Sequence, residues 1–317
     1  MSEDVKAEAP AVTARPQQFR RPPRFEVNGW INLDKPVGVT STQAVARLKR
    51  LFNAKKVGHA GTLDPLASGV LPIAFGEATK TVPIVQDGAK AYEFVVRWGV
   101  ETDTDDAEGK VVATSEARPT LGEIEAALPG FVGLISQTPP TFSAIRIAGE
   151  RAYDLARGGE TFEIAPRLIA IHRFALCTAE RDEARFEAEC GKGAYVRALA
   201  RDLGRTLGCY GHVVFLRRLR VGPFHAEAAT GLEAAEASPE AGAAALQPVE
   251  AGLAELPRLA IDRNGAAILR RGQKLLLRGA ALPPSGPAYA SCLGAPIAFG
   301  AIEDGYFVST RVFNLPL

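Results

Sequence analysis

The segment 58–80, GHAGTLDPLASGVLPIAFGEATK, combines an aspartate with four glycines and two prolines. Much of its backbone is therefore expected to form turns or loops. Asp64 lies inside it, directly before Pro65. A carboxylate held in such a loop can act as a nucleophile or steady a charged intermediate. The structural alternative is a helix start, with the aspartate as N-cap and the proline at the first helical position. The segment is not a P-loop, because the required glycine before the lysine is missing.

A second segment with chemical potential is 191–204, GKGAYVRALARDLG. Gly191 and Gly193 allow close backbone approach, and Tyr195 and Arg197 follow at alternating positions. A lone Gly-x-Gly is weakly specific. Taken by itself, the segment favours a strand-to-helix turn with Arg197 in a surface ion pair.

The third segment is 90–111, KAYEFVVRWGVETDTDDAEGKV. Tyr92 lies at the start of a predicted strand, where an aromatic residue usually belongs to the core. The acidic run that follows fails the spacing of an EF-hand calcium loop. A solvated acidic turn is the expected structure for its four acids, which are Asp103, Asp105, Asp106 and Glu108.

Cysteine and histidine usage excludes several classes of protein. The four cysteines, at 177, 190, 209 and 292, are far apart, and the four histidines form no H-x-x-x-H. This spacing argues against a zinc site and against a disulfide scaffold. No run of apolar residues is long enough to cross a membrane, and the first ten residues lack a secretory signal. We therefore expect a cytoplasmic protein without a metal.

Charge is unevenly distributed although the net formal charge is only +1. Residues 166–224 hold eleven basic and six acidic residues, and residues 257–317 hold seven basic and three acidic residues. Residues 225–256 hold six glutamates and no Lys or Arg. Two basic regions of this kind are compatible with binding a polyanion, but charge alone favours ordinary solvated faces.

The sequence patterns predict a mixture of strands and helices to position these residues, without a regular βαβ repeat, so an α+β fold is expected. The patterns predict strands over 91–100 and 167–190, and helices over 41–52, 120–131 and 194–208. Ser41 is expected to cap the first of these helices. We expect a disordered tail at 1–26, a catalytic domain at 27–233, a connector at 234–256 and a small β-rich module at 257–317.

Taken together, these segments resemble one family. GWINLDKPVGVTS (29–41), GHAGTLDPLASGVL (58–71), KAYEF (90–94), PPTFSAIRIAGERAYDLAR (139–157), GKGAYVRALARDLG (191–204) and LRRLRVGPF (216–224) occur in the order found in the bacterial tRNA pseudouridine-55 synthases, the TruB family. The resemblance covers roughly 27–233. One departure is that two hydroxyl side chains usual in the family are replaced by Gly191 and Ala194, next to Arg197.

The resemblance implies a reaction and its residues. A uridine in the tRNA T loop becomes pseudouridine, without a cofactor, and Asp64 matches the essential aspartate. Arg197 matches the basic residue that pairs with this aspartate and fixes its direction. Tyr92 matches the active-site tyrosine, whose ring can stack on the flipped uracil, and Tyr195 matches a second aromatic of the pocket.

Further matches concern binding of the RNA. His59 matches a residue thought to help hold the everted nucleotide, and Lys35 is expected to meet phosphate or the site carboxylate. The segment 139–157, with Arg146 and Arg157, resembles the RNA-clasping insertion of the family. The last 61 residues, expected to be a small β-rich module, resemble the PUA-like RNA-binding module often appended to these enzymes. We expect a mainly antiparallel catalytic sheet flanked by helices, a monomer, and tRNA as partner.

Two other functions fit the same residues. One is a pseudouridine synthase guided by a separate RNA, against which the segment 139–157 argues. The other is a tRNA-binding folding helper whose catalysis is dispensable.

Overall fold

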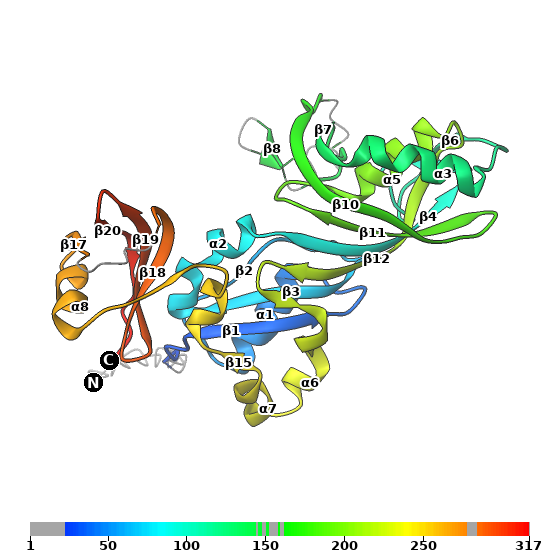
Figure 1. The fold of residues 1–317 in the computed structure, drawn as a ribbon. Coiled ribbons are helices and arrows are strands. Elements are labelled where there is room, and N and C mark those ends of the chain that lie inside the picture. The colour runs from blue at the N-terminus through cyan, green and yellow to red at the C-terminus, as the bar shows by residue number, and fades with distance from the viewer. Residues whose placement is uncertain are drawn as a thin grey trace, which may run out of the picture.

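A computed structural model describes residues 23–143, 145–147, 150–151, 158, 162–277 and 284–316. A long twisted sheet forms the centre, and a smaller sheet lies beside one end of it (Figure 1). The main path of the large sheet runs through β14 (Thr230–Gly231), β1 (Gly29–Lys35), β3 (Ser68–Phe75), β12 (Gly211–Val221), β4 (Lys90–Trp98), β11 (Glu183–Cys190), β10 (Arg167–Ala179) and β7 (Gly133–Gln137). Three short strands pair at its sides: β2 (Val57–His59), β13 (Phe224–His225) and β15 (Leu246–Gln247).

The large sheet is mainly antiparallel. Only β1 with β14 and β12 with β3 pair in parallel among its described strands. β12 lies between β3 and β4, so a strand from late in the chain separates two strands from early in it. The predicted α+β class with a mixed, mainly antiparallel sheet is confirmed.

Helices cover this sheet and give it a continuous apolar core. The helices are α1 (Ser41–Leu51), α2 (Val82–Asp87), α3 (Leu121–Ala127), α5 (Val196–Thr206), α6 (Leu232–Glu236) and α7 (Pro239–Ala244). Two small hairpins project from the body: β5 (Val100–Thr102) with β6 (Val111–Thr114), and β8 (Arg146–Ile147) with β9 (Glu150–Arg151). The strands predicted over 91–100 and 167–190 and the helices predicted over 41–52, 120–131 and 194–208 are all present, with shifted ends.

The cap of α1 differs from the prediction. Thr40 is the N-cap, and it forms a capping box with Gln43, which satisfies two otherwise unpaired amides. Ser41 is instead buried, and its hydroxyl hydrogen-bonds to both the backbone N–H and the carbonyl of Leu63. The assignment of Ser41 as the cap was therefore wrong, because Thr40 supplies the same oxygen one residue earlier.

The C-terminal module is a five-stranded sheet with one helix. Its strands, in spatial order, are β16 (Arg258–Ala260), β18 (Gly286–Cys292), β19 (Ala295–Glu303), β20 (Tyr306–Val312) and β17 (Leu275–Leu276), and its helix is α8 (Arg263–Arg270). The module has a core of its own. A second apolar cluster joins it to the large sheet, because Tyr289 and Phe313 are buried with Trp30 and Phe224.

Residues 234–256, expected to connect the two parts, run between them and also pack on the large sheet. β15 pairs with β1, and Leu253 is buried in the cluster around Trp30. Of the predicted tail 1–26, only residues 23–26 are described, and Phe25 hydrogen-bonds to the backbone of Asn53 and Lys55. No helix within the described ranges is long and apolar enough to cross a membrane.

Candidate active site

A cavity of about 310 Å³ opens where the loop after β2, the start of β4, the start of α5 and the middle of β12 meet. Four of the residues that the sequence singled out line it or border it closely: Asp64, Tyr92, Tyr195 and Arg197. These residues are far apart in the chain, so the sheet topology brings them together. The inserted position of β12 also adds Leu216 and Arg218 to the wall.

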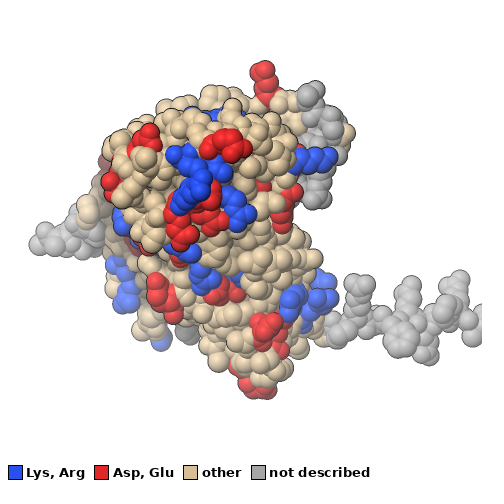
Figure 2. Space-filling model, turned by 90° about the vertical axis from the view of Figure 1, so that its right-hand side faces the viewer, with Lys and Arg blue, Asp and Glu red and all other residues tan. Residues whose placement is uncertain are grey.

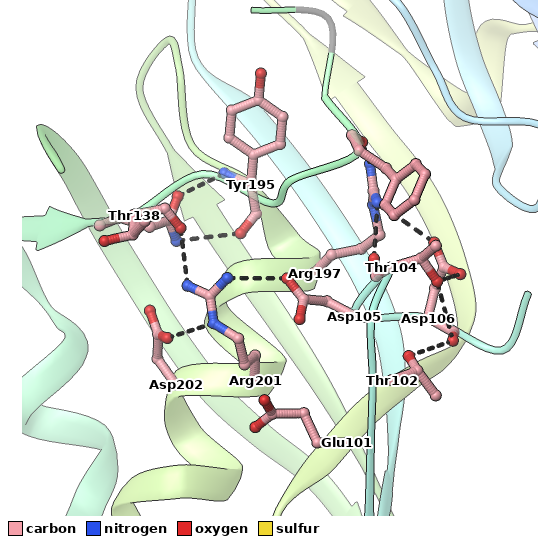
Figure 3. A network of polar contacts seen from close by, with 12 residues as sticks. Glu101, Thr102, Thr104, Asp105, Asp106, Thr138, Tyr195, Arg197, Arg201 and Asp202 are labelled. Carbon is pink, nitrogen blue, oxygen red and sulfur yellow. Dashed lines mark hydrogen bonds and ion pairs between the residues drawn. The ribbon is translucent and has the colours of Figure 1, made fainter. Parts of the chain in front are cut away.

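Arg197 is the centre of the polar contacts (Figure 3). Its side chain is only 6% exposed, and one guanidinium nitrogen, Nη2, lies 3.0 Å from the Asp64 carboxylate. The same nitrogen donates to the carbonyl of Phe142. The other, Nη1, donates to the carbonyl of Thr104 and lies 3.4 Å from the Asp106 carboxylate. A planar guanidinium can make all these contacts at once, which a lysine ammonium cannot.

The position of Arg197 on α5 is electrostatically unfavourable for the helix. It is the second residue of α5, after Tyr195 as N-cap, and a cation near a helix N-terminus meets the positive end of the helix dipole. The two carboxylates in contact with it, Asp64 and Asp106, offset this cost. A buried arginine placed against its helix dipole indicates a role other than stabilising α5.

The loop that carries Asp64 is fixed by contacts on both sides of this residue. The Ser41 hydroxyl holds Leu63, and Gly38 donates a backbone hydrogen bond to the carbonyl of Pro65. Residues 65–66 form a turn and no helix follows, so the alternative that Asp64 starts a helix is wrong. The carboxylate is 35% exposed, which leaves it accessible from the cavity.

Arg218, on β12, also stabilises the loop that carries Asp64. Its guanidinium donates three hydrogen bonds to backbone carbonyls, those of Gly61, Thr62 and Val70. Gly69 has a φ of +103°, and a Cβ there would lie 2.2 Å from the carbonyl oxygen of Arg218, so only glycine fits. Sequence reasoning missed Arg218 as a site residue, although it lies within the matched motif LRRLRVGPF.

The acidic run after β5 is only in part the solvated turn that the sequence suggests, because Glu108 is exposed but two of its aspartates are not. Asp105 and Asp106 are buried, and Asp105 has a positive φ of 61°. Arg201 donates to the Asp105 carboxylate at 2.9 Å. Burial raises the pKa of Asp105 to about 6, while the charges of Arg201 and Arg197 oppose this rise.

A periodic signal could have revealed these contacts. Arg197, Arg201 and Arg205 are spaced four residues apart and therefore lie on one face of α5. Arg205 pairs with Glu101 at the other end of the run. Three arginines on one helix face predict an acidic partner, and the segment 101–106 supplies it.

The two tyrosines of the cavity remain protonated at neutral pH. Burial raises the pKa of Tyr92 to about 12, and the charge and hydrogen bonding of Arg218 oppose the rise. Burial also raises the pKa of Tyr195, against a lowering by the Ser143 hydroxyl. Both rings can thus offer an apolar face and a neutral hydroxyl to a bound base.

Lys35 and His59 lie at the edges of this site. Lys35 is fully buried, and its ammonium donates to the carbonyls of Pro36 and Val39, which leaves no surface for a phosphate to contact. Burial lowers the pKa of Lys35 to about 8, and the Asp64 charge works in the opposite direction. His59 ends β2, two residues before the cavity residue Gly61, and is half-buried.

Of the two arginines expected to contact RNA, the structure describes only one, and only its backbone. The backbone of Arg146 belongs to β8, opposite Arg151, whereas Arg157 lies outside the described residues.

Among the eleven basic residues of 166–224, eight form ion pairs: Arg173, Arg185, Lys192, Arg197, Arg201, Arg205, Arg217 and Arg220. On the face drawn in Figure 2, basic and acidic side chains alternate, with no surface of a single sign.

The donor set of the cavity suits acid–base and nucleophilic chemistry. No group of three or more His, Cys, Asp or Glu side chains within the described ranges is arranged to hold a metal ion. Asp64 is oriented, accessible and charge-paired, which are the properties of a carboxylate that attacks or stabilises an electron-poor carbon. The neutral tyrosine rings beside it can hold a planar base.

Comparison with known proteins gives the family. The model described as "TruB family pseudouridylate synthase (N terminal domain)" matches residues 49–196, and "tRNA pseudouridylate synthase B C-terminal domain" matches residues 197–254. A protein of Bradyrhizobium diazoefficiens called tRNA pseudouridine synthase B is 57% identical over 94% of this chain and 89% of its own. Its namesake from Agrobacterium fabrum is 53% identical over 95% and 99%.

Solved structures agree at greater distance. A structure of an H/ACA ribonucleoprotein bound to a substrate RNA containing 2'-deoxyuridine has a TM-score of 0.70 and 25% identity, covering 91% of this chain and 85% of that one. The residue pattern, the cavity and these similarities lead to one family. The chain belongs to the TruB family of pseudouridylate synthases.

Proposed function

We propose that this enzyme converts uridine to pseudouridine at position 55, in the T loop of tRNA, with Asp64 as its essential carboxylate. The relatives that share more than half of its residues are called tRNA pseudouridine synthase B, which supports tRNA as the substrate. The observation that carries the proposal is the Asp64–Arg197 pair, 3.0 Å apart, at a cavity lined by Tyr92 and Tyr195.

The reaction breaks the bond between the ribose and uracil N1, turns the base, and forms a bond from the same sugar carbon to uracil C5. The hydrogen on C5 leaves as a proton. A base inside a folded RNA loop cannot reach Asp64, so the uridine must leave its stack at a cost of a few kcal/mol. The side chains that line the cavity then keep the detached base in place until it is reattached.

Each cavity residue has a role in this scheme. Asp64 attacks the sugar or the base, or it steadies a cleaved glycal intermediate; its accessible carboxylate suits all of these routes. Arg197 keeps the carboxylate directed into the cavity. The ring of Tyr92 stacks on the uracil, and its neutral hydroxyl is available for proton transfer. Tyr195 forms the second aromatic wall, and His59, two residues before the cavity residue Gly61, helps to hold the everted nucleotide.

The rest of the RNA is gripped elsewhere. Arg146, in the hairpin β8–β9, and Arg157 contact the T stem-loop. The positive charge of Lys35 acts on the Asp64 carboxylate. The C-terminal module acts as a PUA-like RNA-binding module; the four basic residues that lie in or just after α8 (Arg263, Arg270, Arg271 and Lys274) support this assignment. We propose that the enzyme acts as a cytoplasmic monomer.

One alternative is a synthase directed by a guide RNA, which the similarity to H/ACA complexes suggests. The much higher identity to a protein called tRNA pseudouridine synthase B, 57% against 25%, argues against it. A tRNA-folding helper without need of catalysis is the other alternative. The costly arrangement around Arg197, a buried cation at a helix N-terminus, favours an enzyme.

The test is release of tritium from tRNA labelled at uracil C5. We expect the wild-type protein to release it and Asp64→Asn to be slower by at least about 10⁴-fold, with tRNA affinity within a few-fold. Asp87→Asn, an exposed aspartate on α2 that pairs with Lys192, is the control for a lost carboxylate. No release from a folded wild type that binds tRNA would favour the helper, and full release by Asp64→Asn would remove Asp64 from catalysis.

A further inference from the structure

Gln137, the last residue of β7, makes an unusual contact with the cavity residue Tyr195. Its side chain is buried, with the residue 1% exposed. The amide nitrogen donates to the Tyr195 carbonyl at 3.1 Å, and the amide oxygen accepts from the Tyr195 backbone N–H at 2.9 Å. The side-chain amide thus pairs with both backbone groups of one residue, as a neighbouring strand does in a sheet.

Tyr195 needs such a partner because of its place in the helix. It is the N-cap of α5, and no side chain of its own helix caps this end in the described structure. The Tyr195 carbonyl also accepts the first hydrogen bond of the helix, from Leu199. Gln137 therefore fixes the dihedral angles at the residue from which both the Tyr195 ring and the next turn, with Arg197, project.

The neighbouring residue extends this contact. The carbonyl of Thr138 accepts a hydrogen bond from Arg201 at 2.8 Å, one turn further along α5 (Figure 3). Arg201 in turn holds Asp105, and the flanking Thr104 and Asp106 contact Arg197. The end of β7 is thus connected to the Asp64–Arg197 pair both through Tyr195 and through Asp105.

We infer that Gln137 is a positioning residue for the reaction, acting through Tyr195 and Arg197. This inference rests on the proposed function of these two residues. The chemistry of the contact requires an amide of this length. An asparagine is one methylene shorter, and a carboxylate at this place keeps the acceptor but sets a negative charge against the Tyr195 carbonyl. A displacement of about 1 Å at a reacting centre can reduce the rate about 100-fold.

The contact itself can be tested without any turnover. In the free protein, hydrogen exchange of the Tyr195 amide, followed by NMR on ¹⁵N-tyrosine-labelled protein, should show protection. Gln137→Ala should lower this protection by about tenfold or more relative to the other protected tyrosine amides, because the bonded acceptor is gone. Unchanged protection in Gln137→Ala would show that the contact does not hold Tyr195, and would overturn the inference.

The effect on the reaction is measured as single-turnover tritium release with saturating enzyme. Gln137→Ala should lower the rate about 10- to 100-fold while tRNA affinity changes less than about threefold. Asn32→Ala is the matched control, because Asn32 is also a buried side-chain amide, 2% exposed, that donates to a distant carbonyl, that of His225. It should lower the melting temperature but leave the rate of the folded protein unchanged.

Gln137→Glu supplies a rescue that a merely structural role does not predict. A protonated carboxyl group donates from its hydroxyl and accepts at its carbonyl, so it can reproduce both hydrogen bonds of the amide. Burial raises the pKa of such a carboxyl group. The rate of Gln137→Glu relative to wild type should therefore rise as pH falls from about 8 to about 6.

The outcomes separate this inference from the proposed function. Wild-type protein that releases no tritium contradicts the proposed function, whereas amide exchange still reports on the contact. Active wild type with Gln137→Ala within twofold of it, or with equal rate losses in Gln137→Ala and Asn32→Ala, overturns the positioning role. A relative rate of Gln137→Glu that does not change with pH also counts against it.

Discussion

Two carboxylates contact the Arg197 guanidinium, and they differ in their surroundings. Asp64 comes from the glycine-rich loop after β2 and is 35% exposed, 3.0 Å from Nη2. Asp106 comes from the turn after β5 and is 5% exposed, 3.4 Å from Nη1. The Asp106 carboxylate also accepts hydrogen bonds from the Thr104 hydroxyl and the Glu108 amide.

This difference divides the work between the two aspartates. A carboxylate that is accessible and has few other partners can move toward a substrate, whereas one that is buried and bonded on both oxygens is locked in place. Asp106 can therefore act only through Arg197, by anchoring one nitrogen while the other directs Asp64. The guanidinium is the link between a buried carboxylate and an accessible one, which a residue with a single charged atom could not provide.

Arg197→Lys should have the largest effect on this arrangement. The charge is kept, but the fork that contacts both carboxylates is lost, so single-turnover tritium release should fall by about 100-fold or more. Binding of tRNA, measured by filter retention, should stay within a few-fold. A lysine variant with nearly normal rate would mean that charge alone suffices and that the two carboxylates are not linked through geometry.

Asp106→Asn should have a smaller effect, about tenfold in the same rate, because the amide still accepts one hydrogen bond while the charge next to Arg197 is lost. Asp103→Asn is the matched control. Asp103 lies in the same turn, and its carboxylate accepts a hydrogen bond from the Lys110 amide. Equal losses in both variants would mean that the turn as a whole, and not the charge at Asp106, is what matters.

The surroundings of Asp105 are tested by the free energy of unfolding and not by the reaction rate. Its pKa is raised to about 6 by burial, against an ordinary value of 3.8, so between about pH 4 and 6 the folded state holds this proton more often than the unfolded state. The contribution of Asp105 to the unfolding free energy therefore falls as pH rises through this window.

Denaturant unfolding of wild type and Asp105→Asn at several pH values measures this contribution. The difference in unfolding free energy, wild type minus variant, should fall by up to about 3 kcal/mol across the window and stay level above it. A difference that rises with pH would mean that pairing with Arg201 outweighs burial at Asp105.

The sequence predicted most of the local structure and part of the site. The strand with Tyr92 and the helix with Arg197 follow from β-prone composition and from apolar spacing, both of which are local properties. The proximity of Asp64 to Arg197 was expected from the family resemblance alone. No local pattern relates two residues 133 positions apart; their contact depends on the order of strands in the sheet.

The residues that sequence reasoning misjudged fail for a common physical reason. Asp105, Asp106 and Lys35 are charged side chains in polar segments, and such residues are usually solvated. The burial of the two aspartates depends on arginines of the distant helix α5. The burial of Lys35 depends on a local turn, in which its ammonium donates to the carbonyls of Pro36 and Val39. The excess of positive charge over 166–224 does not describe the folded surface either. Most of these basic side chains form ion pairs with acidic residues from other parts of the chain.

The place of β12 has a consequence for how the chain is made. β3 and β4 are neighbours along the sequence, but the gap between them is filled only by Gly211–Val221. At a synthesis rate of about 5–20 residues per second, the ribosome needs on the order of ten seconds between completing β4 and completing β12. During that interval both strands have an open edge available for incorrect pairing. The strand that closes these two edges is also the one that carries Arg218 to the Asp64 loop, so the nascent chain covers both edges and completes the support of this loop in the same event.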